Sequence, residues 1–215
     1  MYLPKSFNAP EHAWQLVQSH PLGQLISVDP QGLPFLSWLP FHVESQGQAD
    51  STGSSGVLLG HLAKANPHVQ LLAERPEVTA VFMGPHAYMP TTVYADSLRV
   101  PTWSYLVVQM RLKSILVEGE AAKDVLLKQL IGDHQPPALV SGEGVPWDVP
   151  ADFTERMLHG IVAYRFEVLE IQSKFKLNQH RKESHVAMHA HYAQGSEAER
   201  ELAQWMTKLG LVGGE

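Results

Sequence analysis

The sequence predicts a mainly β protein of the α+β class, in which helices lie at the periphery of an antiparallel sheet or barrel. The strand-like segments come in runs joined by turns and loops, and they do not alternate one for one with helices. That order argues against a Rossmann-type sheet, in which each parallel strand is followed by a helix. We also find no internal repeat that would indicate a solenoid or a propeller.

The first part of the chain predicts a helix followed by a β-hairpin. Residues 9–19 have apolar side chains at helical spacing, and Pro21 ends this helix because the residue before a proline resists the α conformation. Residues 29–32, Asp-Pro-Gln-Gly, form a turn cluster between strand 22–28 and strand 33–43. Two prolines within the second strand place it at an edge of the sheet or at a bulge.

The next part predicts short elements around a long connection. Residues 44–56 are rich in Gly, Ser and Gln and predict a surface loop, which leads to strand 57–61. Helix 67–75 precedes a strand of the buried type at 77–83. Residues 84–99 contain two prolines and several rings, which predicts an irregular connection. A loop of this length inside a compact domain usually either is functional or covers another part of the protein.

The longest predicted strand, 105–117, opens the second half of the chain. Helices are expected at 121–134 and 151–159, with a loop containing proline and glycine at 135–149. Gly160 directly follows helix 151–159 and is expected to end it, and strand 161–172 comes next.

The C-terminal residues predict a helical extension. Ser196 and Glu199 have the spacing of a capping box, and Gly210 ends the helix that they begin. We therefore expect one domain at residues 1–179 and a helical C-terminal extension at residues 180–215.

Composition and charge exclude several classes of site. The 215 residues are 44% hydrophobic and 18% charged, which is typical of a globular protein. A net charge of −6 disfavours a broad grip on DNA, although it does not exclude a local basic patch. The absence of cysteine excludes disulfides, thiolate metal sites and cysteine nucleophiles. With no signal-peptide pattern and no apolar run of about 20 residues, we expect a cytoplasmic protein that does not bind membranes.

The most unusual segment is residues 100–105, Val-Pro-Thr-Trp-Ser-Tyr, at the start of the longest predicted strand. Because side chains alternate along a strand, Thr102 and Ser104 present hydroxyls on one face while Trp103 and Tyr105 present rings on the other. A flat ligand with a polar edge needs both kinds of surface. From strand composition alone, however, we favour the simpler interpretation that the two rings fill a core.

A second candidate is residues 60–68, Gly-His-Leu-Ala-Lys-Ala-Asn-Pro-His, where a strand ends and a helix begins. Asn66 and Pro67 suit the start of a helix, whose free N–H groups attract anions. Lys64 adds a full positive charge, so a ligand phosphate is one expected occupant. The alternative, that Asn66 only caps the helix and Lys64 is solvated, has equal support.

Two further groups carry positive or titratable side chains. Residues 174–182 form the densest basic run of the chain, which either binds an anion or nucleic acid or, more commonly, is solvated. The second group is a set of four histidines, His180, His185, His189 and His191, of which His185 and His189 have the spacing of one helical face. No carboxylate completes a metal site, so a surface helix is the better interpretation and no metal is expected. Signatures of hydrolases and of nucleotide-binding loops are absent from the sequence.

Five segments, in order, resemble the PaiB-like family of FMN-binding negative transcriptional regulators. They are residues 1–5 (Met-Tyr-Leu-Pro-Lys), 60–67 (Gly-His-Leu-Ala-Lys-Ala-Asn-Pro), 84–88 (Gly-Pro-His-Ala-Tyr), 100–105 (Val-Pro-Thr-Trp-Ser-Tyr) and 174–179 (Lys-Phe-Lys-Leu-Asn-Gln). The resemblance implies a split β-barrel like that of pyridoxamine-phosphate oxidases, a homodimer, and FMN bound at the subunit interface.

The resemblance also implies roles for individual residues. Lys64 and Asn66, with His61 on the strand before them, would face the FMN phosphate. A second set would lie near the isoalloxazine or the interface, namely Thr102, Trp103, Ser104 and Tyr105. A third would approach from the C-terminal side, namely Lys174, Lys176, Asn178 and Gln179.

Three functions fit these expectations. The first is a dimeric FMN-binding negative transcriptional regulator. The second is a flavin-dependent oxidoreductase acting on a small or flat substrate, for which no catalytic residue stands out. The third is an interaction module that retains the fold without the cofactor, an alternative that departures from the family pattern, such as Ser104 in place of Asn, keep open.

Overall fold

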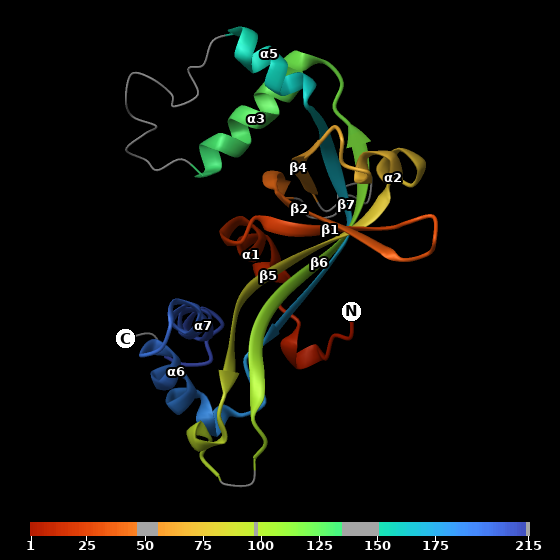
Figure 1. Ribbon diagram of the computed structural model, residues 1–215. Helices are drawn as coiled ribbons and strands as arrows, with labels where there is room; N and C mark the ends of the chain where they lie inside the picture. The colour runs from red at the N-terminus through yellow and green to blue at the C-terminus, as the bar shows by residue number, and fades with distance from the viewer. Residues whose placement is uncertain (47–55, 97–98, 135–150, 214–215) are drawn as a thin grey trace. The chain divides into compact units, whose positions relative to one another are not determined.

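The computed structural model describes residues 1–46, 56–96, 99–134 and 151–213 (Figure 1). Its strands are β1 (Leu22–Val28), β2 (Pro34–Pro40), β3 (His42–Gln46), β4 (Gly56–Ala63), β5 (Glu77–Met89), β6 (Thr102–Leu116) and β7 (Ile161–Lys176). They form one seven-stranded sheet in the order β2-β1-β5-β6-β7-β4-β3. The register is antiparallel for β1 with β2, β1 with β5, β3 with β4, and β4 with β7.

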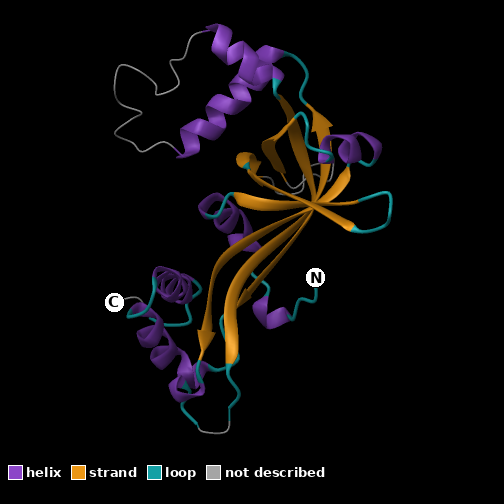
Figure 2. Ribbon diagram, in the orientation of Figure 1, coloured by secondary structure: helices purple, strands orange, loops and turns teal. Residues whose placement is uncertain are grey.

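The helices lie outside this sheet (Figure 2). They are α1 (Ala13–Ser19), α2 (His68–Glu74), α3 (Glu120–His134), α5 (Ala151–His159), α6 (His185–Ala193) and α7 (Glu197–Lys208). The arrangement confirms the predicted α+β class, the antiparallel strands and the helical C-terminal segment. None of the helices in the described ranges is both long and apolar enough to cross a bilayer.

The chain divides into two compact units. We call residues 21–81 and 110–171 the central unit, and residues 1–20, 82–109 and 172–215 the terminal unit. The long strands β5, β6 and β7 each contribute residues to both units. This division differs from the expected boundary at residue 179, which stays a prediction.

In the central unit, strand β4 is buried on both faces. On one face, a Cβ atom at Gly60 would lie 2.9 Å from Leu39 and 3.4 Å from Phe166, so these side chains close tightly over the strand. On the other face, α3 packs against the sheet through a cluster formed by Leu59, Leu126, Leu130 and Ala163. Helix α3 is therefore fixed to the central unit by buried apolar contacts.

In the terminal unit, α1 covers one face of β5 and β6. A Cβ atom at Gly84 would lie 2.6 Å from Leu16 and 3.3 Å from Leu106, which shows how closely helix and strands approach. The C-terminal helix α7 packs nearby, where the ring of Trp205 meets Phe175 edge to face at 5.1 Å. Its predicted capping box is present, with Ser196 N–H donating to Glu199 at 2.7 Å.

Several strands extend beyond their predicted bounds. The irregular connection expected at 84–99 begins as strand, because β5 continues to Met89 with alternating buried and exposed side chains. Strand β7 likewise runs on to Lys176, which places part of the predicted basic run on a strand. Conversely, the strand expected at 33–43 is divided into β2 and β3, and the Phe41 N–H between them donates to Pro21 O at 2.9 Å. The predicted loop 135–149 and residues 47–55 lie outside the described residues.

Candidate functional site

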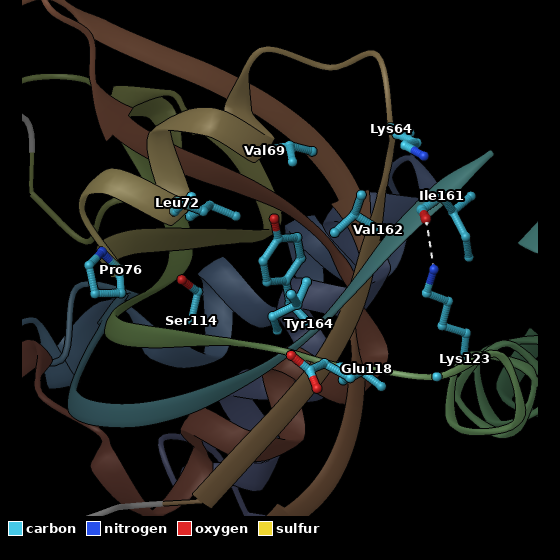
Figure 3. A pocket seen from close by; sticks show the side chains of 14 residues that line it. Lys64, Val69, Leu72, Pro76, Ser114, Glu118, Lys123, Ile161, Val162 and Tyr164 are labelled. Carbon is cyan, nitrogen blue, oxygen red and sulfur yellow. Dashed lines mark hydrogen bonds between the residues drawn. The ribbon is translucent and has the colours of Figure 1, made fainter. Parts of the chain in front are cut away.

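A cavity of about 650 Å³ opens in the central unit at the ends of three strands (Figure 3). Helix α2 supplies one wall, and the ends of β4, β6 and β7 with the start of α3 supply the others. Most of the lining is aliphatic, with Val69 and Leu72 from α2 and Ile161 and Val162 from β7. Such a cavity, apolar with a few polar groups, is typical of a site for a small molecule.

The polar side chains of the lining are few. They are Lys64, Ser114, Glu118, Lys123 and Tyr164. Lys64 follows the last residue of β4, and its backbone N–H donates to Gly160 O at 2.8 Å, which fixes the chain at that point. Lys64 is the one residue of the predicted site set that lines this cavity in the described part of the chain.

Tyr164 stands in the middle of the lining, with its hydroxyl end toward α2 (Figure 3). The side chain is 4% exposed, and burial raises the pKa of the phenol. The hydroxyl therefore stays protonated at neutral pH and is able to donate a hydrogen bond into the cavity. Sequence reasoning missed this residue because nothing local distinguishes it from other strand aromatics.

Asn66 turns away from the expected phosphate position and into the protein. Its Oδ1 accepts the N–H of His68 at 2.9 Å, and its Nδ2 donates to Ser37 Oγ at 3.0 Å. These bonds support the capping interpretation of Asn66. They also make it a positioning residue for the turn that carries Lys64.

His68 completes this buried network. It is fully buried, with Nδ1 at 3.0 Å from Ser37 Oγ and Nε2 at 2.8 Å from Ser27 Oγ. Burial lowers the pKa of His68 to about 4, so the ring is neutral at physiological pH. A neutral ring accepts from one serine and donates to the other, which fits both contacts.

His61 lies on β4 opposite Ala163 of β7 and does not line the cavity. Its Nδ1 is buried and has no hydrogen-bond partner in the described part of the chain. Burial lowers the pKa of this histidine, which favours the neutral ring.

The terminal unit brings together several other predicted residues. The Lys176 ammonium donates to Thr102 Oγ1 and, at 2.7 Å, to the backbone carbonyl of Trp103. It also lies 5.7 Å from the ring centre of Tyr105, and the Lys174 ammonium lies 5.5 Å from the same ring. Burial is the main cause that lowers the pKa of Lys176, with a smaller contribution from Lys174. These lysines are thus bound by the protein's own hydroxyls and rings.

Trp103 is exposed and Tyr105 is half-buried, so the interpretation that the two rings fill a core is wrong. The side chain is 54% exposed and lies 6.1 Å, between ring centres, from both His86 and Tyr88. Ser104 points the other way and is fully buried. The predicted alternation is confirmed, but the hydroxyl of Ser104, not the indole, faces inward.

The remaining predicted residues shape the turn after β7. Asn178 has φ of 56° and donates from its side chain to Tyr94 Oη at 3.2 Å. The Gln179 side chain donates to Phe175 O at 2.5 Å and accepts the Leu177 N–H at 3.0 Å. Both amides therefore hold the turn. His185 and His189 lie on α6 as expected, and no metal-ligand cluster occurs within the described ranges.

Sequence comparison places this chain among known proteins. Residues 1–170 match the sequence family described as "Putative FMN-binding domain". The "Protease synthase and sporulation protein PAI 2" of Bacillus subtilis (strain 168) is 30% identical over 190 residues, which are 86% of this chain and 84% of that protein.

Solved structures share the fold. The flavocytochrome Anf3 from Azotobacter vinelandii has a TM-score of 0.58 and 15% identity, over 79% of this chain and 68% of that one. The FAD and heme binding protein from Mycobacterium smegmatis has a TM-score of 0.58 and 14% identity, over 79% and 72%. The predicted split-barrel fold is confirmed, and the chain belongs to the family of FMN-binding domains that includes the PaiB-like proteins.

Proposed function

We propose that this protein binds FMN through the cavity of the central unit, with Lys64 binding the phosphate. The observation that carries the proposal is the position of the Lys64 side chain at a largely apolar cavity of about 650 Å³, in a chain of the FMN-binding family. That volume lies within the range of about 300–1,000 Å³ of ligand pockets. Apolar walls suit a flat ring system and an ammonium suits a phosphate, so the residues fit the cofactor. When bound, FMN supplies redox chemistry.

The other residues of the predicted site have more indirect parts in this proposal. Asn66 and its network hold the turn that presents Lys64. The remaining predicted contacts to flavin, from His61 and from the terminal-unit residues, stay predictions.

Flavin binding is tested by absorbance of the purified protein and by titration with FMN. We expect Lys64→Glu to abolish binding, because the substitution places a carboxylate beside the phosphate. Lys113→Glu, at an exposed position on β6, is the matched control and should bind normally. A colourless wild-type protein that does not take up FMN would refute the proposal.

We propose further that the protein is a homodimer, joined through the outer face of the β1–β2 hairpin. Leu22, Val28, Leu36 and Trp38 are between 47% and 58% exposed. The register pairs Gln24 with Trp38 and Ile26 with Leu36, which places these side chains on one face without a charged residue. A contiguous exposed apolar patch of this kind marks a protein interface.

The oligomeric state in light scattering tests this interface. Trp38→Glu should give monomers, whereas Val186→Glu, at a 75% exposed site on α6, should not.

We also propose that the protein is a negative regulator of gene expression, a role implied by the resemblance of five sequence segments to the PaiB-like family. Direct contact with DNA is the less favoured route, because net charge is −6 and both Lys174 and Lys176 are bound within the protein. Binding of promoter DNA that weakens steeply with salt would support direct contact. No binding at low salt would point to a partner protein instead.

A flavin-dependent oxidoreductase is the second candidate, favoured by the protonated hydroxyl of Tyr164 in the cavity. Reduction of the FMN-loaded protein by a nicotinamide cofactor would support it, with a slower rate in Tyr164→Phe. Equal rates in the two proteins would exclude this role for Tyr164.

A further inference from the structure

The cavity contains a second ammonium group, which no sequence pattern indicates. Lys123 lies in the first turn of α3 and lines the same cavity as Lys64 from a different element. Its Nζ donates to Ile161 O at 3.4 Å, a long hydrogen bond that is drawn as the dashed line in Figure 3. An ammonium carries three donors, so most of the hydrogen-bonding capacity of Lys123 is left for a ligand.

The surroundings of Lys123 contrast with those of a neighbouring lysine on the same helix. Lys128 pairs with Asp124 at 2.6 Å, one turn apart, as exposed helix lysines commonly do. Lys123 has no such ion pair within the described ranges. Its place in the first turn is also unfavourable for a cation, because the helix dipole is positive at that end. Among the described residues, Lys123 thus keeps an ammonium at the cavity without an ion-pair partner.

The helix that carries Lys123 is held on the sheet. Leu126 and Leu130, about one and two turns beyond Lys123 on α3, pack against Leu59 and Ala163. Lys64 is likewise held by its backbone bond to Gly160. Two ammonium groups from separate elements therefore bracket the same opening, beside Ile161 (Figure 3).

We propose that Lys123 is a second phosphate-binding residue, which binds the phosphate of the flavin together with Lys64. This inference rests on the proposed function. A phosphate monoester carries a charge of about −1.5 to −2 at neutral pH, which two ammonium groups balance and one does not. Glu118, the carboxylate in the lining, opposes binding of an anion and reduces the phosphate affinity.

The test compares FMN with riboflavin, which lacks the phosphate, in fluorescence titrations of wild type and variants. Lys123→Gln should weaken FMN binding about tenfold or more while leaving riboflavin affinity unchanged, because only the phosphate is affected. Glu118→Gln should strengthen FMN binding. Lys128→Gln, one turn further on α3, is the control and should match wild type, and Lys123→Arg should retain most of the affinity.

The outcomes separate this inference from the proposed function. If wild type binds FMN, and Lys64→Glu abolishes binding, but Lys123→Gln binds FMN as wild type does, Lys123 is not a phosphate ligand and the proposed function stands. An equal loss of FMN and riboflavin in Lys123→Gln would also refute the inference, because it would indicate a change in the cavity rather than loss of a phosphate contact. Failure of wild type to bind FMN refutes both.

Discussion

Lysines in the terminal and central units are used in different ways. In the terminal unit, Lys176 donates to a threonine and to a backbone carbonyl, and its ammonium shares the Tyr105 ring with Lys174. In the central unit, Lys64 and Lys123 line a cavity, and among the described residues their ammonium groups have at most a long hydrogen bond to a carbonyl. Both units carry lysines next to aromatic or apolar surface. The difference is that the described part of the fold supplies close partners for the first pair, whereas the second pair lines a cavity, where we propose that it binds a phosphate.

The largest expected effect is on the free energy of unfolding, when one aromatic side chain in each unit is replaced by alanine. Phe166→Ala in the central unit should lower the free energy of unfolding by about 3–5 kcal/mol, because the ring is fully buried and contacts Phe41. Trp103→Ala in the terminal unit should cost less than about 1 kcal/mol, because the indole is 54% exposed. Urea denaturation measures both. Equal losses would show that the exposed face of the terminal unit is covered in solution.

A smaller effect concerns the buried network behind Lys64. In the folded protein the pKa of His68 is about 4, whereas in the unfolded chain it is the ordinary value of about 6.5. Between these values the unfolded state binds more protons, so stability falls as pH decreases, by up to about 1.4 kcal/mol per pH unit from this residue. Denaturation experiments at several pH values in this range give the free energy of unfolding as a function of pH. This free energy should depend less steeply on pH in His68→Gln than in wild type. An unchanged slope, or a His68 ring that titrates near pH 6.5 in the folded protein by NMR, would contradict the prediction.

The smallest expected effect is on the free energy of unfolding when Lys176 or Lys64 is replaced by methionine. Lys176→Met should lower the free energy of unfolding by about 1 kcal/mol, because it removes hydrogen bonds to Thr102 and to the Trp103 carbonyl from a partly buried ammonium. Lys64→Met should change it by less than about 0.5 kcal/mol, because the residues that the structure describes give that ammonium no partner of comparable strength. Thermal denaturation of the two variants without ligand makes the comparison. A reversed order would mean that Lys64 stabilises the protein itself.

Local chemistry explains which parts of the fold the sequence could predict. The β1–β2 hairpin follows from its turn, where Asp29 Oδ1 accepts the Gln31 and Leu33 N–H groups and Gly32 has φ of 84°. The capping box of α7 is equally local, since Ser196 and Glu199 satisfy each other's backbone N–H groups. In both cases neighbouring residues contain all the information. The strand from Gly84 to Met89 was missed because α1, distant in sequence, covers it.

The candidate site depended on long-range packing and was predicted only in part. Lys64 was found because a strand, a turn and a helix start follow one another in sequence. Lys123 and Tyr164 were not found, since only the packing of α3 and β7 around α2 brings them to the same cavity. Trp103 was placed in a core because strand composition does not tell which face of a sheet a helix covers.

The sharing of strands between the two units has a consequence for any attempt to study them apart. The unit borders fall between residues 81 and 82 in β5, 109 and 110 in β6, and 171 and 172 in β7. A cut at any of these places severs a strand in mid-course and leaves backbone groups without ladder partners. Neither unit can be excised as a fragment with intact strand ends, so flavin affinity and dimer formation have to be measured on the undivided polypeptide.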